Sequence, residues 1–299
     1  MDAELRDQRR LHENRVVKYI RWQRLIPAIL LCAGARAQWL NYPEPGVPRL
    51  KNGKVNVNAP TPRAVGGKPD LTGVWLHERN TPAELRRLFG GAAADELEAS
   101  PLGMEIGSAH KYAMNILLDL KPGENILTPA GEAAMKKRAA ERDVTNVCHG
   151  EYGWPVAGLL TEPFKIVQAP KETLILYEVD NLRREIFLGR QFPATFEFPA
   201  YLGYSVGRWE GDTFIVETRG FNDRTPVDAM GHPRSENMHV TERFHRRDFG
   251  HLDVEMTFDD PQLYTRPFSV KIPHELVQDN DIFEMFCNQN EKDRVHMVK

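Results

Sequence analysis

The sequence predicts a mainly β protein, an antiparallel barrel or strongly curved sheet with a helical N-terminal third. Between residues 201 and 260, apolar and polar residues alternate between turn signals, which is the period of strands with one buried face. After Pro163, nine apolar runs are separated only by short breaks, a spacing typical of an antiparallel meander. An N-cap threonine, an N1 proline and a capping-box glutamate at residues 81–84 predict the start of a helix before these runs.

The first 37 of the 299 residues have the pattern of a secretory signal peptide. Basic residues precede an apolar run, Leu25 to Ala35, whose end in Ala35-Arg36-Ala37 predicts cleavage before Gln38. The run is shorter than the roughly 20 residues that span a bilayer. Cys32 suggests a lipoprotein alternative, which Leu31 disfavours because a small residue is expected before a lipidated cysteine. We therefore expect a soluble protein that is periplasmic or secreted and has no membrane span.

Two parts follow the signal peptide. Residues 38–69 are rich in Pro, Gly and Asn without periodicity, so we expect an extended arm. Residues 70–299 are expected to form a single domain, which opens with a strand at Gly73-Val74-Trp75. A helical insertion over about 81–142 is expected to contain two helices, which begin at Thr81 and at Thr128.

The strand-forming runs of this domain are short and close together. They are FKIVQ, TLILYEV, RREIFL, YSVGRW, TFIVETR, MHVTERFHR, LDVEMTF, FSVKI and IFEMFC. Residues 209–212 and 247–250 have the composition of hairpin turns between neighbouring runs. With the strand at Gly73 included, about ten strands favour a barrel.

The same region contains a series of longer motifs: PDLTGVW, PFKIVQ, FLGRQFP, GYSVGRWEGDTFIVET, GHPRSE and HVTERFHRRDFGHLD. As a set, they resemble an uncharacterised family of exported proteins common in Acidobacteria and other soil bacteria, from about Pro69 to the C-terminus. The resemblance implies kinship but no particular activity, substrate or cofactor. Gly73-Val74-Trp75 is also similar to the lipocalin signature, which implies a lipocalin-like barrel by analogy of fold.

The chain departs from the family pattern in two places. Residues 148–155, CHGEYGWP, replace a usual Cys-x-Pro-x-Gly-x-Pro, and residues 225–230 differ as well. We expect His149, Glu151 and Trp154 to define a ligand preference particular to this chain. If the loop 225–230 lines the site, its specificity differs too.

Charge and cysteine content restrict the partners and the compartment. Without residues 1–37, 31 Lys and Arg and 38 Asp and Glu remain, a net charge of about −7, which gives no attraction for nucleic acid. Cys148 and Cys287 remain as an even pair, and in an oxidising compartment such a pair predicts a disulfide. The rival interpretation is that they are metal ligands or a nucleophile.

Glu242 is the most informative single residue. It shares its parity with Met238, Val240 and Phe244, so an apolar stripe carries a carboxylate that needs a partner or a purpose. In a barrel such a carboxylate faces the lumen, as a general base or as a ligand anchor. The alternative is an internal ion pair with Arg184 or Arg208, which share parity with apolar residues of their own runs.

The same run contains His239-x-x-Glu242-x-x-His245, which on a helix would suggest a metal site. On a strand, at about 3.3 Å per residue, the two histidines are roughly 20 Å apart, and Glu242 faces the other way. We therefore expect no metal site here, and no motif elsewhere predicts a cofactor. Tyr201, Tyr204 and Trp209 are expected to form an aromatic wall with Arg208 as its cationic group. With His239, this wall supplies the further candidate ligand contacts, Tyr204 and Arg208 foremost.

These observations favour an exported barrel that binds a small, partly apolar molecule, with Arg184, Arg208, Tyr204, Trp154 and His239 as polar or aromatic contacts. Two alternatives stay open. One is a cofactor-independent enzyme, a hydrolase, isomerase or lyase, in which Glu242 or His149 is the general base beside an arginine. The other is a structural or assembly protein of the envelope that docks through the arm of residues 38–69. The oligomeric state is not predicted.

Overall fold

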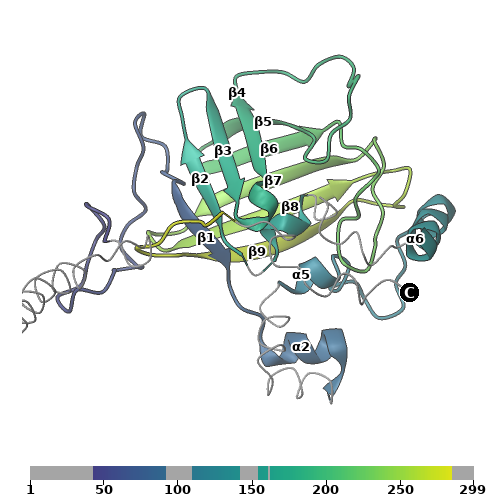
Figure 1. The fold of residues 1–299 in the computed structure, drawn as a ribbon, viewed down its shortest axis with the longest axis horizontal. Coiled ribbons are helices and arrows are strands. Elements are labelled where there is room, and N and C mark those ends of the chain that lie inside the picture. The colour runs from purple at the N-terminus through teal and green to yellow at the C-terminus, as the bar shows by residue number, and fades with distance from the viewer. Residues whose placement is uncertain (1–42, 92–109, 142–153, 161, 285–299) are drawn as a thin grey trace, which may run out of the picture. The chain divides into compact units, whose positions relative to one another are not determined.

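The fold was analysed in a computed structural model, which describes residues 43–91, 110–141, 154–160 and 162–284. These residues belong to one compact unit, Asn41–Lys299. Nine strands close into a barrel in which each strand pairs with the next and β9 pairs with β1 (Figure 1). The strands are β1 (Gly73–His77), β2 (Phe164–Gln168), β3 (Glu172–Tyr177), β4 (Arg183–Leu188), β5 (Tyr204–Glu210), β6 (Thr213–Arg219), β7 (His239–Arg246), β8 (His251–Asp259) and β9 (Phe268–Leu276).

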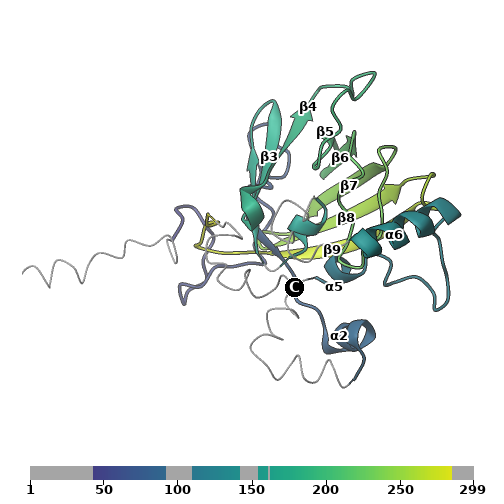
Figure 2. The same ribbon diagram turned by 45° about the vertical axis from the view of Figure 1, so that its right-hand side comes forward.

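The expected fold class is confirmed, with two corrections to the strands. β4 and β5 pair in parallel, whereas every other pair is antiparallel. A parallel pair needs a crossover of about a dozen residues or more, and residues 189–203 provide it (Figures 1 and 2). The run IFEMFC was expected to be a tenth strand, but its described part, residues 282–284, is not a strand.

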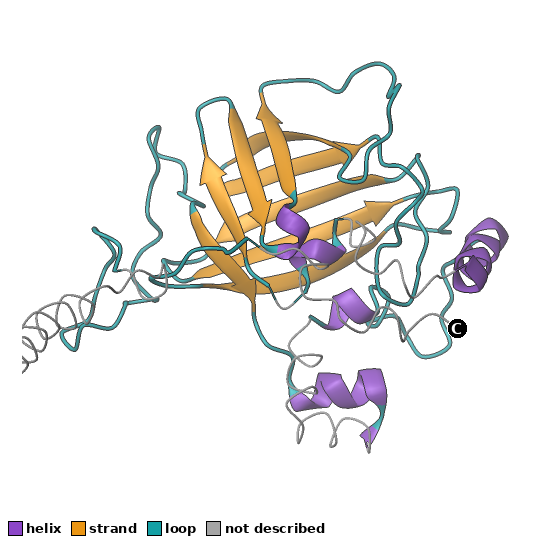
Figure 3. Ribbon diagram, in the orientation of Figure 1, coloured by secondary structure: helices purple, strands orange, loops and turns teal. Residues whose placement is uncertain are grey.

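Helices occupy the connections and strands account for most of the regular structure (Figure 3). The α-helices are α2 (Pro82–Phe89), α5 (Lys111–Met114) and α6 (Pro129–Glu141), and the 3-10 turns are η2 (Val156–Gly158) and η3 (Val179–Asn181). The helix start at Thr81 is confirmed, since Thr81 and Glu84 form the reciprocal capping box. No helix in the described ranges combines the length and apolar character needed to cross a membrane.

Trp75 and Arg246 lie together at one end of the barrel. The Trp75 indole N–H donates to the carbonyl of Leu71 at 2.9 Å, and the Arg246 guanidinium lies 4.9 Å from the Trp75 ring centre. Arg246 also donates to the carbonyls of Asp70 and Phe249. The Trp75 indole and the Arg246 guanidinium, both buried, therefore have hydrogen-bond partners within the protein.

The arm contacts the barrel near the same residues. Val55 and Ala59 are buried, and the Ala59 carbonyl accepts from the Phe249 N–H at 2.8 Å. Arg63 forms two hydrogen bonds, of 2.7 and 2.8 Å, with the Asp212 carboxylate in the β5–β6 turn. In its described part, the proline-rich segment is thus bound along the body of its own chain.

Apolar side chains fill the barrel interior. They include Ile166, Ile175, Ile186, Val216, Val254 and Ile272, each at most 1% exposed. These residues alternate with outward-facing ones along their strands, as the period of two predicts. The interior is therefore mainly a packed core, and the polar groups within it stand out.

Candidate functional site

Glu242 and Arg184 face each other inside the barrel. Nη1 of Arg184 donates to Oε1 of Glu242 at 3.0 Å and Nη2 donates to Oε2, so the pair is bidentate. Both side chains are 1% exposed. Arg184 also donates to the Ser205 and Thr218 hydroxyls at 3.0 and 2.7 Å. The structure therefore brings Glu242 together with Arg184, one of its two expected partners.

Within this network, the charge of Arg184 is compensated by Glu242, and its guanidinium is covered by an aromatic ring. Burial lowers the pKa of Arg184, but the charges and hydrogen bonds of Glu242 and Tyr177 together outweigh burial, so the net shift of the pKa is upward. The Trp154 ring lies 4.4 Å from the guanidinium centre and covers it. A carboxylate held on both oxygens by a permanently charged guanidinium has the features of an internal ion pair, which was the alternative to a general base.

Arg208 is not the partner of Glu242. It lies on the outer face, where its side chain is 52% exposed and bonds to Glu210 at 3.0 Å and Glu217 at 2.8 Å. Ser205 and Gly207 face inward instead, so the expectation that the face of Tyr204, Val206 and Arg208 points into the barrel is wrong. The apolar residues that suggested it are half-buried on the outside of the barrel.

Tyr204 explains why the outer face of this strand is apolar. Its ring contacts Phe187, Phe192 and Phe196, with ring centres 5.1, 6.2 and 6.4 Å away. Phe192 and Phe196 belong to the crossover of residues 189–203, which covers the strand from outside. Tyr204 is thus part of an aromatic cluster on the outer face and does not contact the Glu242 pair.

His239 also lies on the outer face, as does His245, opposite to Glu242; this relation was predicted and is confirmed. Burial and Arg219 lower the pKa of His239, and its Nε2 is 3.9 Å from a Glu217 oxygen. His149, Cys148 and Cys287 lie outside the described residues. Within those residues, no three His, Cys, Asp or Glu side chains are grouped so that they could hold a metal ion.

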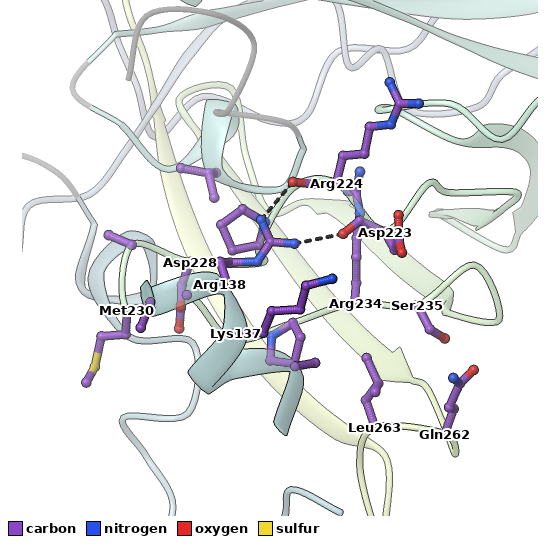
Figure 4. A pocket seen from close by; sticks show the side chains of 17 residues that line it. Lys137, Arg138, Asp223, Arg224, Asp228, Met230, Arg234, Ser235, Gln262 and Leu263 are labelled. Atoms are coloured by element: carbon purple, nitrogen blue, oxygen red, sulfur yellow. Dashed lines mark hydrogen bonds between the residues drawn. The ribbon is translucent and has the colours of Figure 1, made fainter. Parts of the chain in front are cut away.

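A pocket of about 700 Å³ lies beside α6 (Figure 4). Its walls come from α6, from Val156 of η2, from the loop of residues 223–235 between β6 and β7, and from residues 262–263. The apolar part of the wall includes Val156, Pro226, Pro233 and Leu263, and the polar part includes Lys137, Arg138 and Arg234. Neither Glu242 nor Arg184 is part of this lining.

The position of α6 follows from its two ends. At its start, the Thr128 N–H donates to the Leu263 carbonyl at 2.9 Å. Gly131 has no side chain here because a Cβ atom would lie 2.3 Å from the Leu263 carbonyl oxygen. Near its end, Arg138 donates at 2.7 Å to each of the carbonyls of Asp223 and Arg224 (Figure 4). α6 is therefore fixed as one wall of the pocket by contacts with the opposite wall.

The loop of residues 223–235 is held by a buried carboxylate. Asp228 accepts from the N–H of Ile116 at 2.7 Å and from the N–H of His232 at 3.1 Å, and its Oδ2 lies 2.5 Å from His232 Nδ1. The Ala229 N–H donates to the Ala113 carbonyl at 2.7 Å. These contacts tie the loop to α5 and fix the shape of the pocket.

A third polar cluster contains three buried histidines, His77, His110 and His274. The rings of His77 and His110 have centres 5.2 Å apart, and His77 pairs with His274 across β1 and β9. Burial is the main cause that lowers the pKa of all three, to about 2 for His110 and about 3 for His274. The cluster is therefore neutral at physiological pH.

Sequence reasoning missed the pocket. The loop 225–230, which the sequence analysis singled out as a possible part of the site, was its one signal, and Pro226 and Met230 do line it. A scan of the sequence against protein-family models finds no match, and a search of curated proteins finds no relative. The function has to be inferred from the geometry of the pocket.

Proposed function

We propose that this protein is an exported β-barrel protein that binds a small, partly apolar molecule in the pocket between α6 and the loop of residues 223–235. The observation that carries the proposal is the pocket itself. Its volume of about 700 Å³ falls within the roughly 300 to 1,000 Å³ typical of small-molecule sites. Its wall combines an apolar surface with a few polar groups, the usual composition of such sites.

The interior of the barrel is less suited to this role. Apolar side chains fill it, and its buried ion pair is closed by hydrogen bonds within the protein. The pocket beside α6, in contrast, is formed by segments whose backbones are fixed from several directions. A site that exists before the ligand arrives does not have to pay for ordering its walls.

Binding is tested with N-phenyl-1-naphthylamine, a neutral aromatic probe whose fluorescence rises in an apolar site. Ala139 lines the pocket, so Ala139→Trp is expected to fill part of it and weaken probe binding at least tenfold, about 1.4 kcal/mol. Ala133→Trp is the matched control, since Ala133 is exposed on the same helix and is not among the described lining residues. Equal affinities of the two variants would overturn the proposed site.

Export is supported by the pattern of residues 1–37. The intact mass of protein produced with its own signal tests this part of the proposal. A mature chain that begins at Gln38 is expected, and a chain that retains residues 1–37 would contradict export.

A further inference from the structure

Arg234 is an unusual lining residue because it is buried and charged but has no carboxylate partner. It is 2% exposed and donates to the carbonyls of Asn222, Trp154 and Tyr201, at 2.8, 2.9 and 2.9 Å. A fourth bond, of 3.2 Å, goes to the Asn222 side-chain oxygen. All four acceptors are neutral, and no described carboxylate lies within ion-pair distance. Four of the five guanidinium N–H groups are therefore satisfied, while the positive charge is not neutralised.

The carboxylates near the pocket do not supply this missing charge. Asp228 is fully buried, and both of its oxygens are engaged by His232 and by the Ile116 N–H. Asp223 is exposed and acts on Arg234 only through space. Burial is the main cause that lowers the pKa of Arg234, to about 9, and the charge of Arg138 adds to the effect. The protein thus leaves an excess of positive charge at this wall.

Lys137 adds a second cation from the opposite wall. It is exposed on α6, it lines the pocket, and it has no ion pair within the part of the chain that the structure describes. Its side chain extends from α6 into the pocket, whereas the Arg224 guanidinium points away from Arg138 (Figure 4). Lys137 and Arg234 are therefore the two cations best placed to contact a bound molecule.

We infer that the ligand of this pocket is a small amphipathic anion. Its carboxylate, sulfonate or phosphate group binds between Lys137 and Arg234, and its apolar part lies along Val156, Pro226, Pro233 and Leu263. An anion at this place supplies the counter-charge that Arg234 lacks, and charge-assisted hydrogen bonds to oxyanions are stronger than those between neutral groups. The inference rests on the proposed binding function and specifies the class of ligand.

The test compares two probes that share one aromatic skeleton. 8-Anilinonaphthalene-1-sulfonate carries a sulfonate, and N-phenyl-1-naphthylamine lacks it. The wild-type protein is expected to bind the sulfonate about tenfold more tightly or better, with a preference that falls as salt rises from about 0.01 to 1 M. Ala139→Trp should weaken both probes if both occupy the pocket.

Two lysines on α6 provide the matched pair of variants. Lys137→Gln is expected to reduce the preference for the sulfonate severalfold without changing the affinity for the neutral probe. Lys136→Gln, at the neighbouring exposed residue outside the described lining, should leave both affinities unchanged. Arg234→Met should reduce the preference further. If Arg234→Met also loses affinity for the neutral probe, its pocket has collapsed. The result for Lys137→Gln, together with the salt dependence of the wild-type protein, then decides whether these cations bind the anion.

The outcomes separate the two proposals. Equal affinities of the wild-type protein for the two probes would overturn the anionic ligand and leave the binding function standing. Failure of both probes to bind would overturn the binding function, and the inference with it. A preference for the sulfonate that survives Lys137→Gln would place the anion elsewhere and overturn the assignment of these cations.

Discussion

Arg184 and Arg234 are buried in different ways. Each is 2% exposed, and each guanidinium lies over an aromatic ring, Trp154 at 4.4 Å and Phe221 at 4.9 Å. Arg184 faces a carboxylate, and its pKa is raised despite its burial. Arg234 faces only neutral oxygens, and its pKa is lowered. The difference lies in whether the chain supplies the counter-charge.

This difference assigns different roles to the two arginines. Removing one partner of a buried ion pair leaves a charge without compensation, so the Arg184 pair is tied to stability. Arg234 organises the pocket through three backbone carbonyls, yet its charge can still act on a bound molecule. Sequence reasoning placed the candidate site at the first arginine, whereas the pocket adjoins the second.

The largest expected effect comes from breaking the buried pair. Glu242→Gln keeps the shape of the side chain but leaves Arg184 charged at 1% exposure, so we expect a loss of about 3 to 5 kcal/mol in the free energy of unfolding. Urea denaturation monitored by tryptophan fluorescence measures it. If folded protein is recovered, binding of N-phenyl-1-naphthylamine should be unchanged, because Glu242 does not line the pocket.

The double variant Arg184→Met/Glu242→Leu is the control for this prediction. It removes both charges together, so it should be more stable than Glu242→Gln and close to the wild-type protein. If Glu242→Gln costs less than about 1 kcal/mol, the pair is not the structural element that we infer. If Glu242→Gln instead abolishes probe binding in a folded protein, the comparison between the two arginines fails.

The histidine cluster should make stability depend on pH. His110 and His274 have folded-state pKa values near 2 and 3, below the 6.5 of an ordinary histidine, so only the unfolded chain binds protons between these values. Stability is therefore fully present above about pH 7 and is lost as the pH falls below 6.5. Below pH 6.5, each of these two histidines lowers the free energy of unfolding by about 1.4 kcal/mol per pH unit, which amounts to about 2 kcal/mol at pH 5.

His110→Asn tests this dependence with little change of local structure. His110 is the N-cap of α5, its Nδ1 accepts from the Tyr112 N–H, and asparagine is also a good N-cap. The free energy of unfolding is measured by urea denaturation at pH 7, 6 and 5. In His110→Asn, its slope against pH should be smaller than in the wild-type protein by the equivalent of about one bound proton. His245→Asn, on the exposed outer face of β7, serves as the control with an unchanged slope. If the slope of the free energy of unfolding against pH is equal in the wild-type protein, His110→Asn and His245→Asn, the burial of His110 is not the cause of the pH dependence.

The sequence predicted the strands well because alternation depends only on the local chain. The stripe of Val240, Glu242 and Phe244 faces the interior as inferred, and the opposite face carries His239 and His245. Alternation does not say which face is inside, however. The inward face of β5 was misassigned because Tyr204 is covered from outside by Phe192 and Phe196 of the crossover that precedes it.

The pocket could not be predicted from the sequence either, because contacts between separate segments of the chain form it. Its walls come from a helix, a 3-10 turn and two loops, and backbone carbonyls fix their positions. Carbonyl groups occur at every residue and leave no mark in the sequence. Arg234 was visible within the motif GHPRSE, but its lack of a counter-charge appears only when its acceptors are known.

The smallest expected effect comes from Arg208, the rejected partner of Glu242. Its ion pairs with Glu210 and Glu217 are exposed to solvent, which screens the charges, so Arg208→Ala should cost less than about 1 kcal/mol in urea denaturation. The cost should fall further at high salt. Arg184→Ala, measured in parallel, should cost several times more, because it leaves Glu242 buried and unpaired. If the two substitutions cost the same, burial does not distinguish these arginines, and the contrast between Arg184 and Arg234 loses its basis.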